Sequence, residues 1–133
     1  MKISEIIKNA ATILGLTDVV DVIDNGSIQQ RLVNTNFRIL LRATNLVLAS
    51  LVMNHAPLKQ PDNKFVSNIV DGEEENPFDL PPQTLEYGIL AEYAFITGMF
   101  NEAQVWRIKM GEMLFSAKHK TGESKTMPPS FRG

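Results

Sequence analysis

The residue types that most often do chemistry are few in this sequence and lie far apart. The two histidines, His55 and His119, fall at the ends of predicted helices. A metal site or a general base needs partners that converge on the imidazole, and neither histidine has candidates nearby. We therefore interpret both as ordinary surface histidines. Cysteine is absent, which excludes disulfides, thiolate zinc sites and cysteine nucleophiles.

No phosphate-binding loop or catalytic triad is predicted. The glycines of the C-terminal half, Gly88, Gly98 and Gly111, are each isolated, whereas phosphate loops need clustered glycines. No Ser-His-Asp arrangement can be proposed with any force. We therefore expect no enzyme activity, no cofactor and no metal.

An acidic run in the middle of the chain is the first of two charge clusters. Glu73, Glu74 and Glu75 follow Asp71 and Gly72 in what we predict to be a turn. Calcium loops place their ligands at alternate positions rather than side by side. A solvated turn is therefore the favoured interpretation, and a cation site is the alternative.

The second charge cluster is basic. Arg31, Arg38 and Arg42 are seven and four residues apart, which places them on one face of a continuous helix. No acidic residue lies between Ser27 and Asn54. The simpler interpretation is a solvated helix flank. The alternative is a stripe that faces a neighbouring subunit of a ring or faces DNA.

The N-terminal half is predicted to be helical because its apolar residues recur at helical spacing. One helix spans residues 3–14, and a short turn or helix follows at 17–24. Ser27 and Gln30 have the spacing of a capping box, from which one long helix runs to Asn54 without a Gly or Pro. Its second half is apolar nearly all round, which predicts burial between helices or subunits.

Residues 57–82 are rich in proline and are predicted to form a loop. Within it, residues 65–70 have the β-branched content of a strand. A lone strand is not stable by itself, so this small β element would pair near Leu58 or with a neighbouring chain. Loops of this length in a compact domain are usually functional or mobile.

The C-terminal half is predicted to be a helical hairpin followed by an arm. Its helices span residues 84–96 and 101–118, with a turn at Gly98 and Asn101 as the second cap. Residues 119–133 are polar and carry two adjacent prolines, which favours an extended arm. The expected fold is thus mainly α, with a helical domain at 1–118 that includes the 57–82 loop.

Composition indicates one ordinary globular domain. The chain has 133 residues, of which 44% are apolar and 21% charged, and its net charge is −2. Such a charge gives no general attraction to nucleic acid or anionic lipid. The most apolar run, Leu46 to Met53, is far shorter than the roughly 20 residues of a membrane span, and the N-terminus lacks the pattern of a signal peptide. We therefore expect no contact with a membrane.

Residues 80–106 carry a set of short motifs that can be compared with known families. These motifs are Leu80-Pro81, Tyr87-Gly88, Ala91-Glu92-Tyr93, Gly98-Met99-Phe100, Glu102-Ala103 and Trp106. A tetratricopeptide repeat has a similar helix pair, but repeat proteins need about three copies and this chain has one. The motifs resemble those of the tailed-phage head–tail adaptor (connector) proteins, and the Pro128-Pro129 segment resembles the C-terminal arm of that family.

The resemblance implies a structural role in the neck of a virion. Copies made in the host cytoplasm would form a ring, usually twelvefold in this family, beneath the portal protein. The ring would present a surface to a stopper or tail protein, while DNA passes through it without sequence recognition.

The resemblance also implies two sets of contact residues. Those expected to touch the portal lie at the C-terminal end: Lys120, Lys125, Pro128, Pro129, Phe131 and Arg132. Those expected to touch a neighbouring subunit or neck protein are Phe65, Val66, Ile69, Arg31, Arg38 and Arg42.

The alternatives to an adaptor differ in what they predict. A small helical interaction or scaffold module is the first alternative. A helix-turn-helix regulator is less favoured, because the hairpin's second helix begins with only Arg107 and Lys109 as bases, beside Glu102 and Glu112, which is weak for groove recognition. An enzyme is the least favoured.

Overall fold

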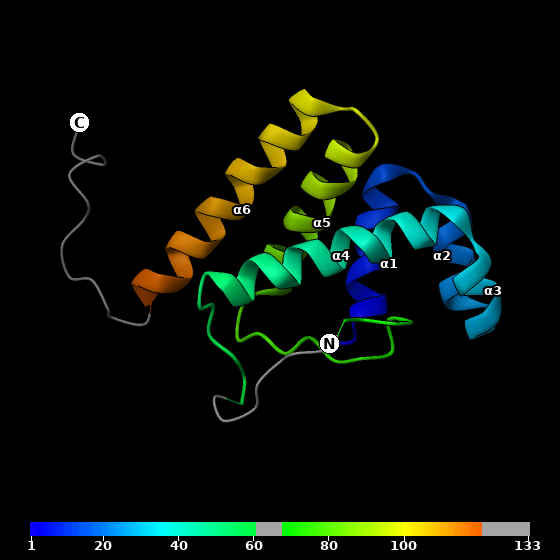
Figure 1. Cartoon of the computed structure of the whole chain (residues 1–133), viewed down its shortest axis with the longest axis horizontal. Coiled ribbons are helices and arrows are strands. Elements are labelled where there is room, and N and C mark those ends of the chain that lie inside the picture. The colour runs from blue at the N-terminus through cyan, green and yellow to red at the C-terminus, as the bar shows by residue number, and fades with distance from the viewer. Residues whose placement is uncertain (61–67, 121–133) are drawn as a thin grey trace.

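The computed structural model describes residues 1–60 and 68–120, with side chains to residue 117, and it is mainly α as predicted (Figure 1). The helices are α1 (Ile3–Leu14), α2 (Thr17–Asp24), α3 (Ile28–Val33), α4 (Thr35–Met53), α5 (Pro82–Ile96) and α6 (Phe100–Lys120). Within the described ranges there is no strand.

Helix α5 is the centre of the packing, because it contacts α1, α4 and α6. Gly88 allows two of these helices to approach its backbone. A Cβ at this position would lie 2.8 Å from Val47 Cγ1 on α4 and 3.0 Å from Met110 Sδ on α6. Gly88 therefore lets α4 and α6 pack closely against α5.

The core is formed mainly by the inner faces of α1, α4 and α5, with smaller contributions from α2, from α6 and from three residues of the central loop, Ile69, Phe78 and Leu80. Its largest fully buried side chains are Phe37, Phe78, Ile3, Ile6, Ile7, Leu40, Leu48, Leu51, Leu85, Ile89, Leu90 and Val19. Because Phe78 belongs to the loop, the segment before α5 is anchored in the core.

The prediction of one helix from Ser27 to Asn54 is wrong, because the chain leaves helical geometry at Asn34 (φ −75°, ψ 122°). The Asn34 side chain accepts a hydrogen bond from the backbone N–H of Phe37 at 2.8 Å and so caps α4. Asparagine is among the best N-cap residues, but no Gly or Pro marks the break. The predicted capping box of Ser27 and Gln30 at the start of α3 is confirmed.

Helix α4 is 19 residues long with a mean hydropathy of 1.3, which is long and apolar enough to cross a membrane by these two criteria. A core helix meets the same criteria. Seven residues of α4 are buried within the described chain, and this packing accounts for much of its apolar content.

The central loop differs from its prediction in how it pairs. Residues 68–70 are not a strand, and residues 61–67 lie outside the described ranges. Two isolated antiparallel bridges occur instead, Lys2 with Glu75 and Leu58 with Phe78. Leu58 is therefore paired within the chain, although with a different partner from the one predicted.

The predicted hairpin of α5 and α6 is present, with Gly98 at φ 82° in the turn. Helix α6 begins at Phe100, so Asn101 lies inside the helix rather than capping it. The helix continues to Lys120, two residues beyond its predicted end. The rest of the predicted arm, 121–133, lies outside the described residues.

Candidate functional site

Arg31 is buried, contrary to the prediction of a solvated side chain, and is only 5% exposed. Its Nη1 donates to the carbonyl of Asp71 at 2.9 Å and to the Glu73 carboxylate at 3.3 Å. Its Nη2 donates to the carbonyl of Ile23 at 3.4 Å, and the guanidinium lies 5.7 Å from the ring centroid of Phe37. Arg31 therefore ties α2, α3 and the central loop together.

The predicted stripe of three arginines does not exist as one surface. Because the helix is interrupted at Asn34, the seven-residue spacing no longer places Arg31 on the same face as Arg38. Arg38 and Arg42 remain on the exposed side of α4. The structure thus brings two of the predicted arginines together and separates the third.

The acidic run is exposed at Glu73 and Glu75, as predicted for a solvated turn, and its carboxylates also bond to other parts of the chain. Glu73 lies between Arg31 and Lys2, whose Nζ is 3.4 Å away. The hydrogen bond from Arg31 holds the pKa of Glu73 below its ordinary value, with Lys2 adding to the effect. The Glu74 carboxylate accepts the backbone N–H groups of Val70 and Gly72. These carboxylates fold the loop around itself and around Arg31.

The same loop caps the first helix. Helix α1 has no side-chain cap, and its first N–H groups need acceptors. The N–H of Ile3 donates to the carbonyl of Glu74 at 2.9 Å, and that of Ser4 donates to Gly72 at 2.8 Å. Gly72 has a φ of 90°, and a Cβ there would lie 3.2 Å from Ser4 Cβ. The loop therefore replaces a cap that the local sequence lacks.

The first candidate binding surface is a shallow groove along the exposed side of α4, which we call the basic groove. Its volume is about 480 Å³. It is lined by Leu32, Arg38, Leu41, Arg42, Asn45, Leu46, Ala49 and Asn68. Both charged residues of this lining are arginines, and most of the remainder is apolar. The basic groove is therefore suited to a surface that carries acidic and apolar groups together.

One edge of the basic groove is held by the central loop. Asn45 accepts from the N–H of Ile69 at 2.7 Å and donates to its carbonyl at 3.0 Å. The Ile69 side chain is only 3% exposed. It supports the groove from inside, so its predicted contact with a neighbouring subunit has no exposed side chain to make it.

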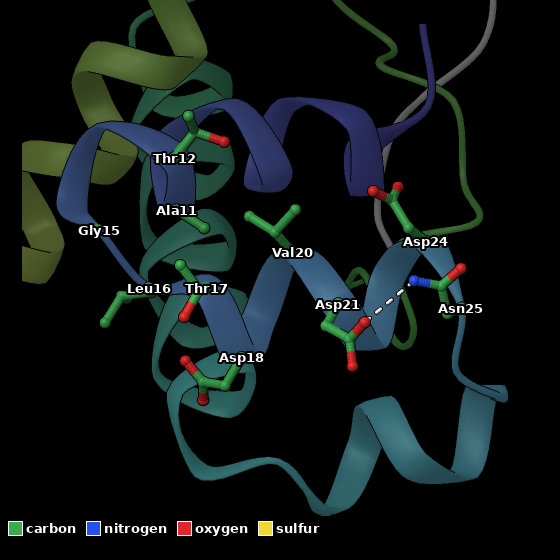
Figure 2. Close-up of a pocket in the computed structure, with 10 residues that line it drawn as sticks. All are labelled: Ala11, Thr12, Gly15, Leu16, Thr17, Asp18, Val20, Asp21, Asp24 and Asn25. Atoms are coloured by element: carbon green, nitrogen blue, oxygen red, sulfur yellow. Dashed lines mark hydrogen bonds between the residues drawn. The ribbon is translucent and has the colours of Figure 1, made fainter.

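The second candidate surface is a groove between the end of α1 and α2, which we call the acidic groove (Figure 2). Its volume is about 700 Å³. It is lined by Ala11, Thr12, Gly15, Leu16, Thr17, Asp18, Val20, Asp21, Asp24 and Asn25. Sequence reasoning missed this site, although three aspartates at intervals of three residues on one short helix were visible.

The carboxylates of the acidic groove are held by different partners. Asp24 forms an ion pair with Lys8 at 2.8 Å. Asp21 accepts from the Asn25 amide at 3.0 Å, which Figure 2 shows as a dashed line. Asp18 accepts from two further asparagine amides, both at 3.1 Å. Slight desolvation works to raise the pKa of Asp18, but these hydrogen bonds outweigh it and the pKa lies below its ordinary value.

The third candidate surface is apolar and lies on α6 and the hairpin turn. Phe95 and Phe100 are 50% and 62% exposed, and their rings meet edge to face at 5.5 Å. Arg107 lies over the Phe95 ring at 5.2 Å. Val105 and Ile108, further along α6, are also exposed, at 52% and 58%. Large apolar side chains gathered in this way are typical of a contact with another protein.

Metal-binding geometry is not found in the described ranges, where no three His, Cys, Asp or Glu side chains converge. His55 follows α4 with a φ of 55° and is exposed.

Several predicted contact residues cannot be placed. Lys120 is the last residue of α6, and its side chain is not described. The predicted residues outside the described ranges are Phe65, Val66, Lys125, Pro128, Pro129, Phe131 and Arg132. Their contacts stay predictions.

Comparison with known proteins returns no family model that matches the sequence, no characterised protein that resembles it and no solved structure that matches it.

Proposed function

We propose that this chain is an assembly protein that binds further copies of itself and a larger partner, in the manner of a head–tail adaptor ring. The exposed apolar surface of α6 and the hairpin turn carries the proposal. Phe100, Ile108 and Val105 are 62%, 58% and 52% exposed. Exposed surface of this kind is unfavourable in water, and a partner protein that covers it removes the cost.

The packing of α6 explains why this surface is free. Trp106, Met110 and Leu114 pack against the core and follow one another at helical spacing. Ile108 lies between Trp106 and Met110 in sequence and Val105 precedes Trp106, so both point to other sides of the helix. A helix that is apolar on more than one side is usually buried by more than one neighbour. Within the described chain α5 covers only one side of α6.

The type of assembly is proposed from the sequence motifs of residues 80–106, which resemble those of head–tail adaptors. Under this proposal the chain forms a ring in the virion neck, beneath the portal and above a stopper or tail protein. The arm after α6 would reach the portal, and DNA would pass through the ring without being read.

Native mass spectrometry of the full chain, alone and mixed with the portal protein of the same genome, tests this proposal. A ring-sized species, or capture of the chain by the portal, is the expected result. A monomer that ignores the portal would refute the adaptor role. The surface of α6 would then belong to a different helical interaction module.

Two variants connect the result to the structure. Truncation after Lys120 retains all of α6, so circular dichroism should show the same helix content while portal capture is lost. Ile108→Gln should weaken assembly without lowering the melting temperature, because the side chain is already 58% exposed. Lys109→Gln changes an adjacent exposed residue and is the matched control. Normal portal docking of the truncated chain would rule out the arm as the portal contact.

A further inference from the structure

The acidic and basic grooves each carry charge that is not neutralised within the described chain. In the acidic groove, Lys8 neutralises Asp24. Asp18 and Asp21 accept hydrogen bonds from asparagine amides and form no ion pair with any residue in 1–60 or 68–117, so their carboxylates are oriented but keep their charge. Two negative charges therefore face solvent on this side.

The basic groove carries unpaired charge of the opposite sign. Arg38 and Arg42 are exposed and form no ion pair with any residue in 1–60 or 68–117. Between and beside them are apolar side chains, of which Leu46 is 45% exposed. Two positive charges thus border an apolar floor that still meets water.

The two grooves lie on different sides of the molecule. Asn36 donates to Asp18, so this residue marks the side of α4 that faces the acidic groove. At about 100° per residue, Arg38 is about 200° further around the helix. The grooves therefore face away from each other, and one molecule cannot close them on itself.

The charged residues on the two helices also have similar spacing. Asp18 and Asp21 are three residues apart, about 4.5 Å along α2, and Arg38 and Arg42 are four residues apart, about 6 Å along α4. Side chains of this length easily absorb such a difference. Both grooves also have apolar linings, with Leu16 and Val20 in the acidic groove. The acidic and basic grooves thus complement each other both in charge and in apolar surface.

We propose that the acidic groove on α2 of one copy docks on the basic groove on α4 of the next copy. Complementary surfaces that point away from each other produce head-to-tail contacts, which close into a ring or continue as a filament. This inference deepens the proposed adaptor function and rests on it, because it names the surfaces by which neighbouring subunits would meet.

A second copy fits the basic groove better than DNA does. DNA phosphates would satisfy the two arginines but would leave the apolar floor, including Leu41 and Leu46, unused. Binding to DNA also depends on the number of phosphates neutralised, and the groove offers only two arginines. The acidic groove offers carboxylates and apolar side chains together.

Site-directed cross-linking tests the contact. Because the chain has no cysteine of its own, only the introduced cysteines can react. Asp21→Cys and Arg42→Cys are made in separate full-length chains, one of them labelled with ¹⁵N. They are mixed and treated with a short flexible bismaleimide, which tolerates geometry that a direct disulfide would not. Mass spectrometry then counts the mixed dimer. Asp21→Cys with Lys109→Cys is the matched control pair.

We expect the Asp21–Arg42 pair to give about two times more mixed dimer than the control pair, since the cysteine substitutions leave one exposed ion pair, Asp18 with Arg38, and one such pair corresponds to a preference of about that size. The excess should fall as salt is added. Equal yields for the two pairs would overturn the proposal. Loss of the excess on addition of a short DNA duplex at low salt would overturn it in favour of a DNA contact.

Charge reversal gives an independent readout in chains that still carry both grooves. Asp21→Arg and Arg42→Asp should each weaken self-association alone, and an equimolar mixture of the two should restore it. Failure of the mixture to recover would contradict the proposed pairing. If cross-linking succeeds but the portal never captures the chain, the contact stands and the adaptor function fails. If the portal captures a ring without this cross-link, the function stands and the contact fails.

Discussion

Arg31 gives the sharpest test of the structure, because a charged side chain that is only 5% exposed must be held by its partners in the fold. The variant Arg31→Ala removes the hydrogen bond to Asp71 and the contact over the Phe37 ring. If Arg31 were a solvated flank residue, the change would cost less than about 0.5 kcal/mol.

The structure predicts a larger loss. A hydrogen bond from a charged donor contributes about 1.5–3 kcal/mol, and a cation over an aromatic ring adds about 0.5–1 kcal/mol. The Glu73 contact adds little, since that side chain is 44% exposed and exposed pairs are weak. The weaker hydrogen bond to the Ile23 carbonyl at 3.4 Å adds about 1 kcal/mol. Among the described residues the buried Arg31 Nε has no hydrogen-bond partner, which costs about 1–3 kcal/mol and offsets part of the gain. We expect a net loss of about 2 kcal/mol.

Urea unfolding followed by circular dichroism measures this loss directly, and the melting temperature should fall by roughly 5–10 °C for a domain of this size. Arg42→Ala is the control, because Arg42 is exposed on α4 and should change stability by less than about 0.5 kcal/mol. Glu73→Gln should lower the stability by less than Arg31→Ala and by more than Arg42→Ala. An Arg31→Ala protein as stable as Arg42→Ala would refute the buried position of Arg31.

The pH dependence of this effect has a definite sign. Arg31 holds the pKa of Glu73 below its ordinary value of 4.5 in the folded chain. Stability from a carboxyl whose pKa is lowered by folding is present above the ordinary pKa and is lost as the pH falls through the folded value. Acidification below pH 4.5 should therefore reduce the difference in the free energy of unfolding between the wild type and Arg31→Ala. A gap that widens in acid would contradict the Arg31–Glu73 contact.

Three further predictions concern single residues that position the helices and the central loop. Gly88→Ala should destabilise by about 1–3 kcal/mol, although alanine favours helices, because its Cβ would lie 2.8 Å from Val47; an unchanged unfolding midpoint in urea would contradict the close helix approach. Gly72→Ala should cost about 1–2 kcal/mol, because its φ of 90° suits only glycine, and faster hydrogen exchange at Ser4 would show the loosened cap, whereas unaltered exchange would count against it. Burial raises the pKa of Glu86 from its ordinary value of 4.5, so its charged form opposes folding as the pH rises. Glu86→Gln should therefore raise the melting temperature at neutral pH more than below pH 4.5, and an equal change at both would be inconsistent with a buried carboxyl.

Much of the helical structure follows from the sequence because its signals are local. Apolar spacing predicted α1 with its bounds, and residues 17–24, predicted as a short turn or helix, form α2. The hairpin of α5 and α6 was predicted from the turn at Gly98, although α5 begins at Pro82 and α6 at Phe100, before the predicted starts at residues 84 and 101. Ser27 and Gln30 predicted the capping box at α3. Each signal acts over three or four residues, which is the reach of one helical turn.

The break between α3 and α4 is a feature that local sequence signals do not determine. Asn34 is both a residue that a helix tolerates and a good N-cap, and the sequence around it does not say which role it takes. The structure resolves the choice through the Asn34 amide, which also donates to Asp18 of α2. A contact from another helix therefore favours the break.

The candidate interaction surfaces were decided by the tertiary structure. Arg31 bonds to Asp71, which is 40 residues away, and no spacing rule extends over that distance. The central loop caps α1 from more than 65 residues away. The exposed acidic turn therefore also belongs to the fold. The acidic groove exists because α1 packs on α2, and the basic groove exists because α3 and the central loop pack beside α4. Local periodicity determines which residues form helices, but charge pairing and burial depend on which helices meet, and that is set by the packing of the whole chain.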